Sequence, residues 1–273
     1  MANQETDWIS VSVGGLALCW SEFAHAVGGR NEDWPLAWVA DGASPNPFLN
    51  AATLKRPLAD GDAAELTAEL ESFFGARAGG PWLLWSGWPT PDLRAHGYVL
   101  WGHPPVLVRP AGGEAPPSPA ELRIVESRDA STIADVERVL VDGYPVLGVE
   151  GLLPGGVVPP AILGGSVRLW VGYVDDRPVS VAAVVLDGKV NHVCLVATLP
   201  DARRKGYGRA LTWQATLADP RLPALLESSA DGYPLYAEMG YEVVGQLSLW
   251  ERPRDMRNPV YSPYAPVGKA TGG

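Results

Sequence analysis

The chain has 273 residues, a length that accommodates two domains of about 130 residues each. Apolar residues make up 47% of it and charged residues 19%, which is enough apolar material for a core without disulfide bonds or metal ions. The formal net charge of −10 argues against nucleic acids and anionic membranes as partners, and two cysteines are too few for a disulfide framework or a cysteine metal site.

The N-terminal segment lacks the basic stretch and the apolar run of a signal peptide. No apolar stretch elsewhere approaches the length of a membrane span. We therefore expect a cytoplasmic protein that contacts no membrane and holds no metal.

The first 110 residues give weak structural signals. Loose alternation over residues 7–20 favours a strand, and apolar residues at helical spacing predict a helix over residues 63–77. The later signals predict a buried strand over residues 81–86, a short helical turn over 92–97 and a strand over 98–108.

Residues 110–120 read PAGGEAPPSPA, a composition that stops apolar periodicity and cannot pack a core. We therefore predict a domain over residues 1–110, a linker over 111–120 and a second domain over 121–252. Residues 253–273 are rich in Pro and Gly and are expected to form an extended tail.

The second domain gives clearer signals, which alternate between strands and helices. Asp129 or Ser131 can cap a helix that ends near Val141, and Asp187-Gly188 suits a two-residue hairpin turn. The predicted strands cover residues 122–126, 168–174, 179–186, 189–198, 224–228 and one or two strands within 241–250, and the later helices cover 208–218 and 234–238. The Gly- and Pro-rich residues 143–165 are expected to shape an acceptor site.

The chemistry is expected in the sequence VATLPDARRKGYGRAL, residues 196–211, where a strand runs into a turn and a helix follows at once. Gly206 and Gly208 allow close backbone approach, and the start of a helix presents unpaired N–H groups with partial positive charge. Four basic residues surround this turn in an acidic chain: Arg203, Arg204, Lys205 and Arg209. Such a turn suits a diphosphate, although R-x-x-G-x-G alone also occurs in surface turns.

This segment resembles the coenzyme A signature of the GNAT N-acetyltransferases, which is a strand, the pattern R/Q-x-x-G-x-G/A and a helix. Downstream, LESSADGYPLYAEMGYEVV is similar to the next strand of that family and to its terminal helix with Tyr236, Gly240 and Tyr241. The resemblance spans about residues 122–252, and one departure is Arg204, where the family more often has Gly. It implies an α/β (α+β) fold with a mixed, largely antiparallel GNAT-type sheet flanked by helices.

The resemblance also implies roles. Tyr236 matches the tyrosine that protonates the departing thiolate, and Val196 or Ala197 would supply an N–H to the oxyanion. The donor would be acetyl-CoA or another acyl-CoA, held by the following residues: Val196, Ala197, Thr198, Arg203, Arg204, Lys205, Gly206, Tyr207, Gly208 and Arg209.

The general base is less defined by the sequence. His192 is the first candidate because imidazole titrates near neutrality, and Glu227, Glu150 or a water chain are alternatives. Cys194 on the same strand is interpreted as a packing residue rather than as a nucleophile.

The first half has no Arg-x-x-Gly-x-Gly turn, yet residues 91–101 echo the 234–241 region, since a short helix leads to Gly-Tyr and a strand in both. Some GNAT proteins are tandem, so this half is interpreted as a second, degenerate GNAT-like domain; an unrelated scaffolding α/β domain is the alternative. The expected activity is transfer of an acyl group from acyl-CoA to the amine of a small molecule, by direct attack through a tetrahedral intermediate. Two alternatives stay open, namely a donor carried by an acyl carrier protein and a non-catalytic acyl-CoA sensor.

Overall fold

The computed structural model describes residues 6–77, 80–144 and 155–254. In chain order, the half before the linker contains α1 (Trp8–Ala26), β1 (Arg30–Asp33), β2 (Ala37–Asp41), the 3-10 helix η1 (Pro47–Leu49), β3 (Asn50–Leu54), α2 (Asp62–Gly75), β4 (Trp82–Ser86), the 3-10 helix η2 (Leu93–His96), β5 (Val99–Gly102) and β6 (Pro105–Arg109).

The half after the linker contains β7 (Arg123–Glu126), α3 (Ala130–Gly143), η3 (Pro160–Ile162), β8 (Val167–Val174), β9 (Arg177–Leu186), β10 (Asn191–Thr198), η4 (Pro200–Ala202), α4 (Tyr207–Thr216), β11 (Ala224–Glu227), α5 (Tyr233–Glu238), β12 (Glu242–Gln246) and β13 (Ser248–Arg252). These elements confirm the predicted strand and helix order of this half. Its helix α3 is capped by Asp129, whose carboxylate accepts a hydrogen bond from the backbone N–H of Thr132.

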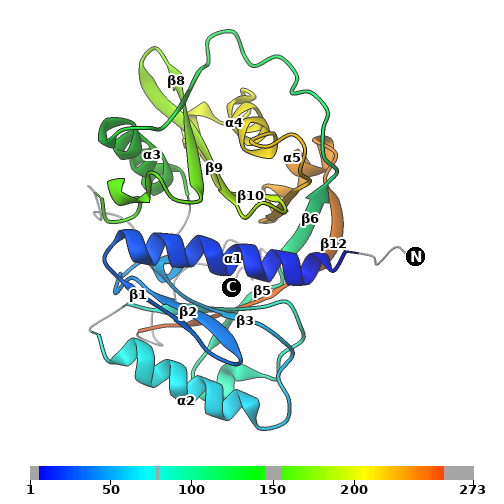
Figure 1. The fold of residues 1–273 in the computed structure, drawn as a ribbon. Helices are drawn as coiled ribbons and strands as arrows, with labels where there is room; N and C mark the ends of the chain where they lie inside the picture. The colour runs from blue at the N-terminus through cyan, green and yellow to red at the C-terminus, as the bar shows by residue number, and fades with distance from the viewer. Residues whose placement is uncertain (1–5, 78–79, 145–154, 255–273) are drawn as a thin grey trace, which may run out of the picture.

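The strands form two sheets, a first of order β1-β2-β3-β4-β13-β5 and a second of order β12-β6-β11-β10-β9-β8-β7. Each sheet contains one strand from the other half of the chain. β6 lies between β11 and β12 in the second sheet, and β13 lies between β4 and β5 in the first. The two halves are therefore joined by a reciprocal exchange of their last strands, and the linker crosses over the second sheet from β6 to β7 (Figure 1).

The two halves follow the same plan. In each sheet one pair of neighbouring strands is parallel, β3 with β4 in the first and β10 with β11 in the second, and the other pairs are antiparallel. In each half a helix, α2 or α4, connects the parallel pair. Both sheets are thus the mixed, largely antiparallel sheets that were predicted.

The repeat extends to the Gly-Tyr pairs. Gly97 and Gly240 both have positive φ, +80° and +84°, and both end a short helix. Tyr98 donates its backbone N–H to the carbonyl of Leu93, and Tyr241 donates its N–H to that of Tyr236, five residues back in each case. The echo between residues 91–101 and 234–241 is therefore a structural one.

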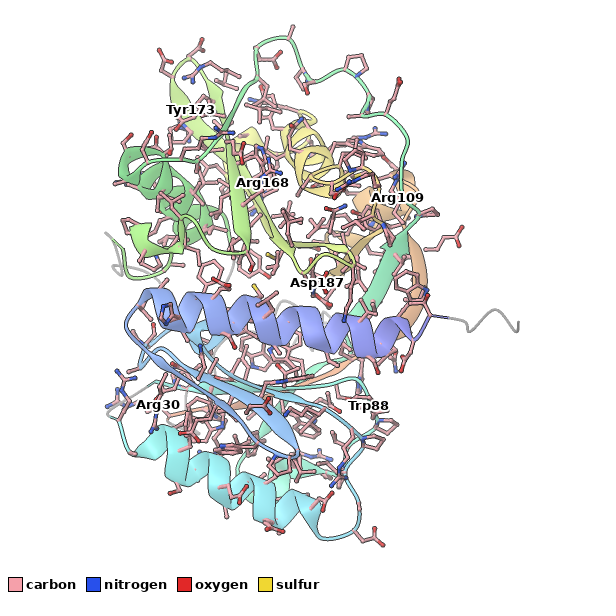
Figure 2. The ribbon with its side chains drawn as sticks, viewed as in Figure 1. Arg30, Trp88, Arg109, Arg168, Tyr173 and Asp187 are labelled. Atoms are coloured by element: carbon pink, nitrogen blue, oxygen red, sulfur yellow. The ribbon has the colours of Figure 1, made fainter. Side chains whose placement is uncertain are left out.

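The helix α1 lies between the two sheets (Figure 1), and side chains pack on both sides of it (Figure 2). The prediction of a strand over residues 7–20 is wrong. The carboxylate of Asp7 caps the helix by accepting from the N–H of Ser10, and a wide face of α1 is buried. Because it packs against both halves, its apolar residues occupy more than one narrow stripe, and this blurs the helical period.

Two more expectations change. The strand predicted over residues 98–108 is two strands, β5 and β6, which belong to different sheets and are separated by His103 and Pro104. Strands β1, β2 and β3 were not predicted. β1 exposes three of its four residues while β3 buries all five, so neither shows a clean alternation of apolar and polar residues.

The core has two parts, which follow the two faces of the first sheet. Alternate residues such as Ala51 and Leu83 pack into one large cluster with α1 and the second sheet. Their neighbours Ala52 and Leu84 pack into a smaller cluster with α2. The larger cluster is continuous between the halves. None of the described helices is long and apolar enough to cross a membrane.

Candidate active site

The second sheet opens at its parallel pair. β10 pairs with β11 through Asn191 and His192 alone, and the two strands separate beyond that point. On its other side, β10 has a bulge between Cys194 and Ala197, and Leu195 within it has φ of +51°. Along residues 193–198, β10 therefore pairs with no described strand on the side of β11, and Val196 and Thr198, which were expected to help hold acyl-CoA, lie in this stretch.

A cavity of about 120 Å³ lies at this opening. The bulged strand provides one wall, the end of β11 and α5 a second, and α1 with η1 a third. The lining residues are Leu16, Trp20, Phe23, Asn46, Phe48, Leu49, Trp85, Leu140, Val141, Tyr144, Val157, Val193, Cys194, Leu195, Val196, Leu226, Glu227, Ser229 and Tyr236. The first half of the chain thus completes a cavity that opens in the sheet of the second half.

Tyr236 lines this cavity from α5. Burial raises the pKa of its phenol well above the ordinary value, and the neighbouring Tyr144, Tyr241 and Cys194 add to the effect. The phenol is therefore protonated at neutral pH. Tyr241, by contrast, shares a hydrogen bond of 2.7 Å between its hydroxyl and that of Thr216, away from the cavity lining.

Glu227 is the charged side chain among the lining residues. Its Oε2 lies 2.9 Å from Nε2 of His192, and its Oε1 accepts a 2.5 Å hydrogen bond from the hydroxyl of Ser12 on α1. His192 is 1% exposed and is not among the lining residues. Glu227 therefore lines the cavity, and its carboxylate is held by Ser12 and His192, which do not line it.

The pKa of His192 reflects two opposed influences. Burial, the largest, favours the neutral imidazole, but the charge and the hydrogen bond of Glu227, with smaller help from Cys194 and Asp187, outweigh it and raise the pKa. Nδ1 of this ring is buried without a hydrogen-bond partner in the described part of the chain. Gly15 of α1 leaves room for the ring, since a Cβ there would lie 1.9 Å from Nδ1.

Cys194 does not lie in a reactive arrangement. Its Sγ is 4.0 Å from Sγ of Cys19 on α1, and both cysteines are free thiols. The hydrogen bond to Cys194, together with burial, raises the pKa of the Cys19 thiol well above the ordinary value. Of the two cysteines, Cys194 lines the cavity and Cys19 does not. Glu150, the other candidate base, lies outside the described residues.

The basic turn follows β10 directly. Gly206 has φ of +83° and occupies the cap position of α4, where it offers no side-chain hydrogen bond to the first helical turn. The first amides of α4 thus have no capping side chain, and the first turn of the helix contains no acidic residue. Gly208 lies so close to β10 that a Cβ would be 2.9 Å from the hydroxyl oxygen of Thr198.

The basic residues of the turn differ in what they contact. Arg203 donates to the carbonyls of Thr198 and Gly143, so it holds the turn against β10 and α3. Arg204 and Lys205 are exposed, and Arg204 has φ of +62°, the conformation for which Gly is favoured. Gly adopts this conformation without strain, which is a physical reason for the Gly that the family resembled by the sequence more often has at this position.

Two other predicted binding residues are held by neighbours in the protein. The hydroxyl of Tyr207 donates to Glu121, which raises the pKa of that phenol, and its side chain is buried. The hydroxyl of Thr198 shares a hydrogen bond of 2.8 Å with that of Ser180. Arg209 has a buried Nε with no partner among the described residues. The side-chain hydroxyls of Tyr207 and Thr198 are thus engaged within the protein, and so is the backbone carbonyl of Thr198.

The corresponding positions of the first half lack these features. Its central strand β3 pairs regularly with β4 over residues 51–53. Gly61, with φ of +89°, occupies the cap position of α2 as Gly206 does in α4, but the first turn of α2 carries Asp62 and Glu65. Leu93, fully buried, stands where the second half has Tyr236. The first half thus keeps the fold without the groups of the site.

Sequence reasoning missed several contributors to this site. Ser12, Gly15, Trp20 and Phe48 come from the first half, and Glu137 of α3 holds the wall near Val157 by accepting the N–H groups of residues 155, 157 and 158. The Gly14-Gly15 pair inside an apolar segment was one available signal of close packing. No local sequence pattern marks the other contributors, Ser12, Trp20, Phe48 and Glu137, as parts of a site.

Residues 165–243 match the family model of the acetyltransferase (GNAT) domain. No curated protein matches the sequence. Among solved structures, the chain is similar to a GCN5-related N-acetyltransferase from Kribbella flavida, with a TM-score of 0.63 and 21% identity over 90% of this chain and 96% of that chain.

Two other structures are similar over most of their length. A functionally unknown conserved protein from Staphylococcus epidermidis has a TM-score of 0.60 and 12% identity over 83% of this chain and 95% of its own. A GNAT-family protein from Novosphingobium aromaticivorans has a TM-score of 0.56 and 14% identity over 90% and 99% of the two chains. These likenesses concern the fold and cover both halves. Residues 165–243 thus match the GNAT acetyltransferase domain model, and both halves of the chain have a GNAT-like fold.

Proposed function

We propose that this protein is an N-acyltransferase that moves an acetyl or another small acyl group from acyl-CoA to the amine of a small molecule. The opening between β10 and β11 would receive the pantetheine arm, and the amides from Arg204 to Arg209 would receive the diphosphate. The observation that carries the proposal is this continuity, because the opening, the cavity and an uncapped helix start lie along one strand and the turn that follows it.

Glu227 is the proposed proton acceptor. The amine arrives as an ammonium ion and must lose one proton before its nitrogen can attack the thioester carbonyl carbon. Glu227 lines the cavity, and Ser12 and His192, which do not, hold both of its carboxylate oxygens. His192 would share the proton with Glu227 through the 2.9 Å contact until the proton is released to solvent with the products, so the two residues act as a pair.

Tyr236 is the proposed proton donor. When the new C–N bond has formed, the C–S bond breaks and the thiolate of coenzyme A takes the phenolic proton. Tyr236 is then reprotonated by the proton that the acylated nitrogen gives up. The balance is one ammonium ion and one thioester consumed, with one amide, one thiol and one proton formed. The position of Tyr236 on the cavity lining supports this role, and its buried phenol is in the protonated form that has a proton to give.

The backbone of the bulge is the proposed oxyanion site. Val196 lies in the irregular part of β10, where its N–H has no partner strand on the side of β11. An N–H aimed at the carbonyl oxygen of the thioester would stabilise the negative charge that develops there.

The proposal is tested by incubating the protein with acetyl-CoA and a panel of amines while measuring free thiol and the mass of the product. Thiol release that depends on an amine, with a product heavier by one acetyl group, is the expected result. Calorimetry with acetyl-CoA is the parallel measurement. Saturable binding without turnover of any amine would favour a sensor instead, and absence of binding would favour a donor on a carrier protein.

A further inference from the structure

The cavity wall supplied by the first half is aromatic. Trp20 stacks against Trp85 with ring centroids 6.3 Å apart, and Phe48 packs against Trp20 at 5.6 Å and edge-on against Tyr144 at 6.0 Å. Phe48 and Tyr144 are half-buried, so their rings are accessible to a ligand, while Leu16 and Phe23 of α1 close the rest of the wall.

The charge of the lining is negative. Glu227 is its charged residue, and none of the described lining residues is Lys, Arg or His. A positively charged ammonium group is attracted by this carboxylate and by the faces of the aromatic rings. A ligand carboxylate would meet no cation on the described lining, since His192 is paired with Glu227 and is not a lining residue, and it would have to lose its water without compensation.

This charge also distinguishes an amine from an acyl chain as the occupant. A long acyl chain in the cavity would bury the carboxylate of Glu227 against methylene groups. An amine places its ammonium beside Glu227 and its tail among the rings. The proton acceptor and the apolar wall then serve the two ends of one small molecule.

The size of the cavity limits that tail. Its volume of about 120 Å³, part of which the thioester would occupy, is below that of the engineered apolar cavity of about 150 Å³ that binds benzene, so it sets an upper limit on the tail. Building on the proposed function, we infer that the acceptor is a small primary amine with one apolar tail no larger than a benzene ring and no carboxylate.

Three amines test this inference directly: benzylamine, 4-(aminomethyl)benzoate, which adds a carboxylate to the same frame, and ethylamine, which lacks the ring. With acetyl-CoA as donor, we expect kcat/KM for benzylamine to exceed that for ethylamine by at least about tenfold. We expect 4-(aminomethyl)benzoate to be worse than benzylamine by at least about a hundredfold. Equal kcat/KM for benzylamine and 4-(aminomethyl)benzoate would overturn the inference.

Phe48→Ala provides the matched variant. It removes one ring from the wall, so the ratio of kcat/KM for benzylamine to that for ethylamine should fall by about tenfold. Using a ratio cancels any loss of folded protein. Tyr233→Ala removes an aromatic side chain that is 42% exposed and outside the cavity lining, and it should leave the ratio unchanged.

Two further outcomes separate this inference from the proposed function. If hexanoyl-CoA acylates ethylamine faster than acetyl-CoA does, the cavity holds the acyl chain and the inference is wrong while the transferase proposal stands. If no amine is acylated at all, the transferase proposal fails. Calorimetric titration with benzylamine and 4-(aminomethyl)benzoate then still decides the inference, because benzylamine should bind and 4-(aminomethyl)benzoate should not.

Discussion

Tyr236 has a position and a protonation state that match its proposed role. Its phenol lines the cavity, and burial keeps it protonated. Tyr236→Phe keeps the ring and its contact with Tyr241, whose centroid is 6.0 Å away, and removes only the hydroxyl. We expect kcat to fall by about 10²-fold or more, with the affinity for acetyl-CoA unchanged. Steady-state kinetics and calorimetry measure the two quantities. Tyr241→Phe is the control for a lost hydroxyl, and unaltered turnover in Tyr236→Phe would remove the proton-donor role.

His192 should make stability depend on pH in a defined direction. Its pKa is raised in the folded protein, so the folded state holds the proton more tightly than the unfolded chain does. The stabilisation is therefore fully present below the ordinary pKa of about 6.5 and is lost as the pH rises through the higher folded value. Urea unfolding of the native protein and of His192→Gln, compared from pH 5.5 to 9, should give a stability difference that shrinks with rising pH. A difference that grows with pH would mean that Glu227 does not raise the pKa of His192.

At the level of single elements, the two helix starts at Gly61 and Gly206 form a natural comparison. Both glycines have positive φ and both cap a helix that connects the parallel strands of its sheet. Valine at either position would be strained by roughly 1–2 kcal/mol. We expect Gly206→Val to weaken coenzyme A binding at least about tenfold, because the strained turn can no longer present its amides.

Gly61→Val is the control for this prediction. It should lose a similar amount of stability while binding coenzyme A as well as the native protein does, because Asp62 and Glu65 already make the start of α2 acidic. Calorimetry on both variants gives the answer. Equal losses of affinity would place the diphosphate elsewhere than at α4.

The elements also show what a sequence can and cannot predict. The turn before α4 is readable because its glycines, its basic residues and the following helix are local features. The bulge in β10 is not, since Leu195 at φ of +51° is not a residue type that favours this conformation. Ser12 reaches Glu227 across 215 positions of sequence, so no local pattern could pair them. The site was predictable at the turn before α4 and unpredictable at the bulge of β10 and where the packing of α1 completes it.

At the scale of the whole molecule, the same limit applies to the strand exchange. β6 and β13 carry ordinary strand patterns, and nothing in their residues identifies the sheet that each one joins. The composition of the linker marks a break in the chain. The sheets do not divide at this break, because β6 before the linker belongs to the second sheet and β13 after it belongs to the first. Each half donates the strand that lies beside the parallel pair of the other half's sheet, and α1 packs between both.

Cutting the linker tests whether this exchange holds the halves together. Residues 113–118 are exposed, so a protease site inserted after Glu114 should be cleaved in the folded protein. Separation of the two pieces would require β6 to leave its place between β11 and β12, and β13 to leave its place between β4 and β5. Each step would break two strand pairings and open the shared core.

We therefore expect the cleaved halves to elute together on gel filtration in native buffer and to separate only in denaturant. Complete cleavage is verified on a denaturing gel. Because the cavity needs α1 from one piece and β10 from the other, the cleaved complex should also retain its capacity to bind acetyl-CoA. Two pieces that separate as folded monomers would show that the exchanged strands contribute little to the association of the halves.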